Sequence, residues 1–345
     1  MTVQQNQDFV KIYQQKAAKG HTGLCHACPV CNGLACKNTV PGPGAKGMGG
    51  AATRNYNAWQ NIYLNLDTIC QERPVDTSCE MFGKRYPFPI FAAPIGAVNE
   101  HYSQELKQEE YDEELIRGCS MAGVEPFTGD GLHDEYFPGA CKIINKYNTG
   151  IVTIKPWAKE RVFQRIDMAK AHNVQVMCMD IDGAGLPMLK NANPPSGSKT
   201  VEELHEIIEY AGVPFIIKGI MTPAGAIKAK EAGATAIVVS NHGGRVLDQG
   251  AATAWVLPEI ADAVGNDMTV LVDGGIRTGS DVFKALALGA HGVLVGRPIA
   301  VCVYGGGAEA VNAYLHQLAS ELQDAMQMCG PRTLAEINRS HIMIR

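Results

Sequence analysis

Short apolar runs alternate with amphipathic segments from about residue 85 to the end of the chain. Most runs are continuously apolar and rich in β-branched residues, which is typical of parallel strands buried on both faces. The segments between them carry apolar residues at helical spacing, for example residues 201–211 and 222–232. The eight predicted strands span residues 89–96, 125–129, 151–157, 174–182, 215–220, 236–243, 269–275 and 292–298. Eight strand–helix units predict an α/β fold, a closed (β/α)8 TIM barrel, with an open doubly wound sheet as the alternative.

The two ends of the chain depart from this alternation. Residues 1–20 are polar with helical character, whereas residues 21–50 contain four cysteines and a glycine-rich stretch without a helical or strand period. Residues 309–328 carry apolar positions at helical spacing and predict a final helix packed on the barrel. We therefore expect an N-terminal helix and a Cys/Gly-rich extension over residues 1–50, followed by the barrel over residues 51–345.

Composition narrows the class of protein. Hydrophobic residues make up 46% of the 345 positions, enough for a large core. The net charge of −5 gives no reason to expect nucleic acid or an anionic membrane as a partner. The start of the chain lacks the apolar core of a signal peptide, and no apolar run approaches the length of a membrane span. These features predict a cytoplasmic protein whose 11 cysteines are mostly reduced thiols or metal ligands.

Polar side chains gather where the predicted strands end, and in a barrel these carboxyl ends form the active site. The last four strand ends carry Lys218, then Ser240-Asn241-His242-Gly243-Gly244-Arg245, then Asp273-Gly274-Gly275-Ile276-Arg277, and finally Gly296-Arg297-Pro298. Glycines let backbone N–H groups approach an anion closely, and arginines offer two parallel donors. The last two strand ends therefore predict a phosphate site, with ordinary turn glycines and surface arginines as the alternative.

His242 is the candidate general base, because it lies in a glycine-flanked turn at the active end of the barrel. We expect Asp273, at the neighbouring strand end, to orient its imidazole, and Arg245 to hold a substrate carboxylate. Lys218 is predicted inside a buried strand, where an unpaired charge is costly, so it should face an anionic ligand or an acidic neighbour. A base beside a carboxylate clamp predicts removal of a proton or hydride next to an acid group.

Four stretches of the sequence resemble the FMN-dependent 2-hydroxy acid oxidase and dehydrogenase family, which includes glycolate oxidase, lactate oxidase and flavocytochrome b2. They read VVSNHGGRVLD, DGGIRTGSDVFKALALGA, GVLVGRP and EINRSHI, and the likeness runs from about Arg54 to the C-terminus. The resemblance implies FMN-dependent oxidation of a small 2-hydroxy acid to a 2-oxo acid, with oxygen or a protein as the final electron acceptor. It also implies a homo-oligomer, since related barrels are commonly tetramers.

The same resemblance implies roles for individual residues. His242 would take the substrate's proton, Asp273 would pair with it, and Arg245 would bind the substrate carboxylate. Lys218 would stabilise the reduced flavin at its N1/O2 edge. The other cofactor contacts would come from Pro94, Ile95, Gly96, Ser240, Asp273, Gly274, Gly275, Arg277, Gly296 and Arg297.

Half of the expected substrate pocket departs from the family pattern. Trp157 stands where the family has a substrate-binding tyrosine, and Lys155 where it has a glutamine that contacts the flavin. The N-terminal substrate tyrosine has no equivalent, and the fourth loop, residues 183–201, is short and lacks the second substrate arginine. We expect Trp157 to reach the substrate through its indole N–H and Lys155 to contact the flavin. Two alternative functions are a flavoenzyme similar to type 2 isopentenyl diphosphate isomerase and a non-catalytic flavin or metal redox sensor.

Four cysteines in the extension, Cys25, Cys28, Cys31 and Cys36, form the pattern C-x2-C-x2-C-x4-C. Four thiolates can hold zinc or another structural metal in a tetrahedron. They can instead hold an iron–sulfur cluster, because three closely spaced cysteines plus a fourth resemble ferredoxin runs. Free thiols or a redox disulfide are the third interpretation. Residues 42–47 match G-x-G-x-x-G, but no strand precedes them, so they predict a loop against the barrel mouth and not a dinucleotide site.

Overall fold

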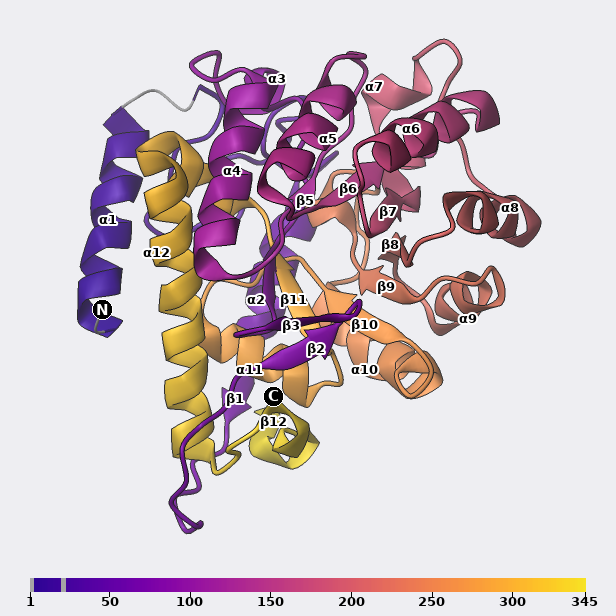
Figure 1. Ribbon diagram of the computed structural model, residues 1–345. Helices are drawn as coiled ribbons and strands as arrows, with labels where there is room; N and C mark the ends of the chain where they lie inside the picture. The colour runs from indigo at the N-terminus through magenta and orange to yellow at the C-terminus, as the bar shows by residue number, and fades with distance from the viewer. Residues whose placement is uncertain (1–2, 20–22) are drawn as a thin grey trace.

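The computed structural model describes residues 3–19 and 23–345, and its centre is a barrel of eight parallel strands (Figure 1). The strands are hydrogen-bonded in the order β4-β11-β10-β9-β8-β7-β6-β5, and a parallel bridge between Ala92 and Pro126 joins the two ends of this series. Their bounds are β4 Ile90–Ala92, β5 Phe127–Thr128, β6 Ile151–Ile154, β7 Met177–Asp180, β8 Phe215–Ile220, β9 Ala236–Val239, β10 Thr269–Val272 and β11 Gly292–Val295. All eight predicted strands and the barrel are confirmed.

A helix follows every barrel strand and covers the outside of the barrel (Figure 1). These helices are α4 Gln108–Ala122, α5 Tyr136–Tyr147, α6 Lys159–Ala171, α8 Val201–Ala211, α9 Pro223–Glu231, α10 Thr253–Val264, α11 Gly279–Ala287 and α12 Arg297–Cys329. Helix α8 has the predicted bounds because local chemistry defines both ends. Thr200 Oγ1 accepts from the Glu203 N–H at 3.2 Å, and Gly212 ends the helix with a φ of 63°.

The remaining strands and helices are additions to the eight strand–helix pairs of the barrel. Strands β1 and β12 pair antiparallel, as do β2 and β3. Their bounds, with those of the other helices, are α1 Val3–Lys19, α2 Gly50–Gln60, β1 Ile62–Leu64, β2 Cys79–Met81, β3 Lys84–Tyr86, α3 Val98–His101, α7 Pro187–Lys190 and β12 Ile342–Ile344. Short 3₁₀ turns occur at Ile181–Gly185, His242–Gly244, Leu334–Glu336 and Arg339–His341.

The barrel strands are buried along almost their whole length, which explains their continuously apolar sequences. Phe91, Phe127 and Phe215 are fully buried among the β-branched residues of the neighbouring strands. Except for β8, which has the predicted bounds, the observed strands are shorter than the predicted ones, mainly because the chain turns out of the sheet at their carboxyl ends. Those turns, and not the strands themselves, carry most of the candidate active-site residues.

Helix α1 packs along α12, which is longer than the helix predicted over residues 309–328 (Figure 1). A kink at Gly306 and Gly307, where the backbone leaves helical geometry, joins the two halves of α12. A Cβ at Gly305 would lie 2.1 Å from the carbonyl oxygen of Tyr13, so the absence of a side chain permits the close approach of the two helices. The first half of α12 was not predicted, because Gly305, Gly306 and Gly307 interrupt the helical pattern before residue 309.

The segment between α1 and α2 lies against the carboxyl ends of the barrel strands. The Lys46 N–H donates to Gly244 O at 2.9 Å, and Arg297 Nε donates to Pro43 O at 2.6 Å. The prediction of a loop at the barrel mouth is therefore confirmed. Within residues 3–19 and 23–345, no helix has the length and apolar character needed to cross a membrane.

Candidate active site

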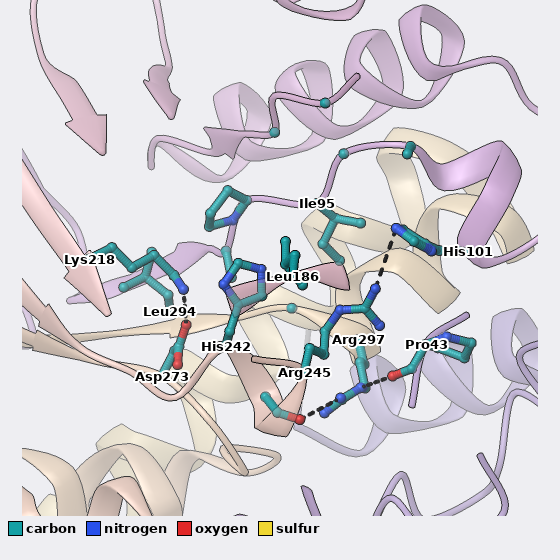
Figure 2. Close-up of a pocket in the computed structure, with 18 of the residues that line it drawn as sticks. Pro43, Ile95, His101, Leu186, Lys218, His242, Arg245, Asp273, Leu294 and Arg297 are labelled. Atoms are coloured by element: carbon teal, nitrogen blue, oxygen red, sulfur yellow. Dashed lines mark hydrogen bonds and ion pairs between the residues drawn. The ribbon is translucent and has the colours of Figure 1, made fainter. Parts of the chain in front are cut away.

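A cavity opens at the carboxyl ends of the strands, and Pro43 lies at one side of it (Figure 2). Its lining brings together most of the predicted site residues: Pro94, Ile95, Gly96, Lys155, Lys218, His242, Arg245, Asp273, Gly274, Gly275, Arg277, Gly296 and Arg297. Two predicted residues, Ser240 and Trp157, lie outside the lining. Parallel strands deliver these side chains to one place because all of their carboxyl ends meet at the same rim.

His242 faces the cavity from the turn after β9, and its partner is Asp182, not Asp273 as predicted. Nδ1 of His242 lies 2.9 Å from Oδ1 of Asp182, which follows β7. Asp180 is the next carboxylate, with Oδ2 at 3.9 Å. When Nδ1 donates to Asp182, the lone pair of the neutral ring is at Nε2. The structure therefore gives the predicted base a different orienting carboxylate from the one that the sequence predicted.

The backbone of this turn is unusual. His242, Gly243 and Gly244 have φ values of 56°, 62° and 83°. A Cβ at Gly244 would lie 2.8 Å from the Cβ of Ala51, so this glycine allows α2 to approach the turn. The left-handed conformation at His242 itself is rare for a residue with a side chain, and such strain is concentrated at functional sites.

Asp273 pairs with Lys218 across the neighbouring strand ends (Figure 2). Lys218 Nζ lies 3.2 Å from Asp273 Oδ2 and donates to Ser240 Oγ at 2.9 Å. Ser240 is fully buried and lies behind the lysine, so it positions Lys218 instead of lining the cavity. Burial opposes the charge of Lys218, but Asp273, Asp182 and Asp180 hold its pKa above its usual value. The site thus keeps a fixed cation at the position predicted to meet the flavin.

Lys155 and Asp180 form a second buried ion pair beside the base. Lys155 Nζ lies 2.5 Å from Asp180 Oδ2, and the side chain of Asp180 is 1% exposed. Atoms of Asp180, Asp182 and His242 lie within 4.8 Å of one another, as in a metal site, but Lys155 already balances the Asp180 charge. Burial, Lys155 and Lys218 lower the pKa of His242 well below its usual value, against the opposing effect of Asp180. The imidazole is therefore neutral at neutral pH and able to accept a proton.

Arg245 and His101 converge on the cavity with donor groups only (Figure 2). The Gly42 N–H donates to Nδ1 of His101 at 3.0 Å, and burial followed by the Arg245 charge lowers the His101 pKa to about 3. The neutral ring therefore carries its proton on Nε2, which lies 3.4 Å from Nη2 of Arg245. Neither nitrogen can accept from the other. The two N–H groups would both be satisfied by an anionic or carbonyl oxygen that accepts a hydrogen bond from each.

Arg245 is held in place by the loop over the barrel mouth. Its Nη1 donates to the carbonyl oxygens of Gly42 and Gly44. Burial and the nearby Arg297 lower the pKa of Arg245 to about 10. Within the described part of the chain, Arg245, Arg277 and Arg297 form no ion pair with a carboxylate. Three cations without counter-charges around one cavity indicate a site for anionic ligands.

The predicted phosphate site has the backbone geometry that an anion needs. Gly274 and Gly275 have φ values of 90° and 93°, and a Cβ at Gly275 would lie 2.5 Å from the carbonyl oxygen of Asn55. Arg297 begins α12, so the N-terminal end of this helix points toward the same cavity. The two glycines, the N-terminus of α12 and the two arginines fit the phosphate end of FMN. Lys218 fits its flavin end.

Trp157 does not reach the cavity, which corrects its assignment to the substrate. The side chain is fully buried, and its indole N–H donates to Asp130 Oδ2 at 2.7 Å. The same Asp130 oxygen accepts from the Lys155 N–H at 3.1 Å. Because its single donor is already used, Trp157 supports the strand ends and has no group left for a substrate.

Three residues of the site were missed by the sequence analysis. The Asp180 and Asp182 pair could have been found, because acidic residues two apart at a strand end commonly carry function. His101 had no such signal. It lies on α3, an insertion after β4 without a recognisable spacing, and only folding brings it to Arg245.

The features above define a class of protein, an FMN-binding barrel oxidoreductase, and comparison with known sequences identifies the family. The model of the FMN-dependent dehydrogenase family matches residues 43–192 and 185–344. The chain is 45% identical over 323 residues to the peroxisomal (S)-2-hydroxyacid oxidase GLO3 of Arabidopsis thaliana, covering 84% of this chain and 86% of that protein. The protein belongs to the FMN-dependent dehydrogenase family, and the predicted family and cofactor are confirmed.

Other relatives and structures agree with this assignment. An L-lactate oxidase of Roseobacter sp. (strain GAI101) is 47% identical over 138 residues, 40% of this chain and 37% of that protein. Several curated relatives are matched, like this one, over less than half of their own length. A mandelate oxidase variant with an FMN adduct superposes with a TM-score of 0.74 at 27% identity, covering 88% of this chain and 93% of that one. A lactate oxidase of Pediococcus acidilactici, at 24% identity and a TM-score of 0.79 over 97% and 94% of the two chains, shares the fold.

Proposed function

We propose that this protein oxidises a 2-hydroxy acid to the 2-oxo acid. The observation that carries the proposal is the conjunction, in one cavity, of a neutral, partly buried histidine and an arginine whose donors have no anionic partner among the described residues. A base alone would fit many reactions. A base beside an unfilled carboxylate clamp fits removal of a proton next to an acid group.

The substrate carboxylate would lie between Arg245 and His101. Their facing N–H groups are 3.4 Å apart at the nitrogens, and one carboxylate can accept from both. His101 thus supplies, from α3, a polar contact on the side where the family pattern is incomplete. Fixing the carboxylate also orients the carbon that carries the hydroxyl group toward His242.

His242 would take the substrate's proton on Nε2. The Asp182 carboxylate holds the opposite nitrogen at 2.9 Å and stabilises the charge that the imidazole gains. Asp180 forms an ion pair with Lys155, and Asp182 is the nearer carboxylate to the His242 ring.

FMN would be held by Lys218 at its flavin end and by Arg277, Arg297 and the glycines after β10 at its phosphate end. When bound, it supplies the acceptor for the two electrons that leave the substrate. The ammonium of Lys218 has a raised pKa and stays charged, so it stabilises negative charge that develops beside it.

The acid would carry an apolar side chain. The apolar side chains of Ile95, Leu186, Met188 and Leu189 line the cavity together with the charged groups. The relatives are named for (S)-2-hydroxy acids and lactate, and one structural neighbour for mandelate. The final acceptor, oxygen or a protein, stays a prediction, as do the tetramer and the cytoplasmic location.

An anaerobic absorbance titration tests the function. Purified protein is mixed without oxygen with lactate, mandelate and 2-hydroxy acids of intermediate size. We expect one or more acids to bleach the flavin bands of the wild type. A His242→Asn variant should retain FMN but bleach at least about 100-fold more slowly, since general-base catalysis contributes on the order of 10²–10⁴.

Two outcomes would contradict the proposal. Bound FMN that no 2-hydroxy acid bleaches would favour an isomerase-like flavoenzyme or a redox sensor. Failure to bind added FMN would instead show that the lining residues of this cavity do not form an FMN site.

A further inference from the structure

A second cavity lies beside the first and is lined by all four cysteines of the extension, Cys25, Cys28, Cys31 and Cys36. It measures about 300 Å³. Its walls come from α1, the segment between α1 and α2, and the start of α12. The substrate and flavin do not account for it, because the predicted base and its carboxylates lie in the other cavity.

The spacing of the thiol sulfurs argues against a single zinc ion. With Zn–S bonds of about 2.3 Å, a tetrahedron places the sulfur atoms about 3.8 Å apart. In the described residues, no three cysteine sulfurs lie within 4.8 Å of one another. The four side chains surround a space instead of converging on a point. An iron–sulfur cluster needs this wider arrangement, since its irons and sulfides lie between the thiolates.

The charges around this cavity suit an anionic cluster. Thiolates outweigh the positive charge of an iron–sulfur core, so such a site needs cations nearby. Arg277 Nη2 lies 3.6 Å from Cys31 Sγ, and its Nε donates to the Cys31 carbonyl at 2.7 Å. Lys11 and Arg297 also line the cavity, whereas its described lining contains no Asp or Glu.

We propose that Cys25, Cys28, Cys31 and Cys36 bind an iron–sulfur cluster. The first three have the C-x2-C-x2-C spacing of bacterial ferredoxin runs. Pro43, Arg277 and Arg297 line both cavities, so the cluster lies next to the predicted phosphate end of FMN. This proposal does not depend on which substrate the flavin oxidises.

Metal and sulfide analysis of the full chain tests the cluster. Protein purified without oxygen, or reconstituted with ferrous iron and sulfide, should contain iron and acid-labile sulfide in equal amounts. It should also give an electron paramagnetic resonance signal after chemical reduction. Cys28→Ser and Cys31→Ser should each lose most of the iron and sulfide. Their FMN content, measured in the same samples, reports whether the barrel has folded.

Cys79→Ser is the matched control, because Cys79 is a half-buried thiol on β2, outside the cavity. It should retain both iron and sulfide. One zinc per chain without sulfide would overturn the proposal, as would an absence of iron in reconstituted protein that binds FMN. Unchanged iron in the Cys31→Ser variant would also overturn it.

Discussion

Two carboxylates at the barrel mouth have separate partners, and this division determines the chemistry of individual residues. Asp273 lies against the ammonium of Lys218, and Asp182 lies against the imidazole of His242. If both acids faced the lysine, the histidine would have no fixed tautomer and no partner for the charge it gains. In the proposed mechanism, this pairing assigns one strand end to flavin stabilisation and another to proton transfer.

Replacing Asp182 with Asn should reduce kcat by about 10²–10⁴-fold, because an amide can no longer fix the productive tautomer or stabilise the imidazolium. Steady-state kinetics with the best acid from the titration would measure this loss. FMN content should be unchanged. Asp267→Asn, at an exposed carboxylate paired with Lys230, is the control and should have wild-type kcat. Equal activity of the two variants would show that Asp182 does not position the base.

Arg245→Lys should raise KM more than it lowers kcat. The lysine keeps the charge but loses the planar pair of donors, which costs about 1.5–3 kcal/mol, or about 10–160-fold in kcat/KM. Kinetics with the preferred acid would measure the split. Arg339→Lys, on the surface and paired with Asp262, should change neither constant. A fall in kcat alone would place Arg245 away from the substrate carboxylate.

Acid should destabilise the protein through His101 and His242. Both have folded-state pKa values below the ordinary 6.5, with His101 at about 3. Below pH 6.5 the unfolded chain therefore binds protons that the folded chain does not, and the free energy of unfolding falls as the pH falls. Each group contributes up to about 1.4 kcal/mol per pH unit.

Urea unfolding between about pH 6.5 and pH 5 would measure this slope. His101→Asn should make the slope shallower. An unchanged slope in that variant would mean that His101 is charged in the folded protein.

At the scale of elements, the turns after β9 and β10 are built from backbone that only glycine adopts easily. Gly275 combines a φ of 93° with a neighbour 2.5 Å from the position of a Cβ. This backbone conformation is unfavourable for other residues. With glycine it lets α2 approach the strand ends and leaves N–H groups exposed to a phosphate.

Gly275→Ala should destabilise the fold and weaken FMN binding, whereas Gly83→Ala should only destabilise it. Gly83 has a similar φ of 75° but nothing within 4 Å of a Cβ. The left-handed conformation alone costs about 1–2 kcal/mol, and the clash at Gly275 adds about 1–3 kcal/mol. Denaturant unfolding and FMN titration would measure both effects. Equal losses in the two variants would mean that backbone strain alone, without the clash, accounts for the effect.

At the scale of the whole molecule, FMN held as proposed would connect several strand ends of the barrel, from Lys218 on β8 to Arg277 after β10 and Arg297 after β11. Ligand binding to the folded state alone stabilises the entire barrel. At about 100 times its Kd, FMN should contribute about 2.7 kcal/mol to the free energy of unfolding.

Riboflavin, which lacks the phosphate, should raise Tm less than FMN at equal concentration. Thermal unfolding with each ligand would measure the difference. Arg277→Gln should reduce the difference, because one of the two guanidinium groups facing the phosphate is lost. An equal rise in Tm with both ligands would place the phosphate away from Arg277 and Arg297.

The sequence by itself determined the barrel, the order of its strands and the residues at their carboxyl ends. Buried parallel strands need continuous apolar runs, and a phosphate turn needs glycine and arginine. Both features can therefore be recognised in the local sequence. Only the tertiary structure decided which groups pair. His242 contacts Asp182 and not Asp273, and His101 lies beside Arg245. The indole of Trp157 contacts Asp130. All three arrangements depend on contacts between distant segments. The same holds for the cysteines, whose spacing allows zinc, a cluster, free thiols or a redox disulfide, whereas only the fold shows that all four line one cavity.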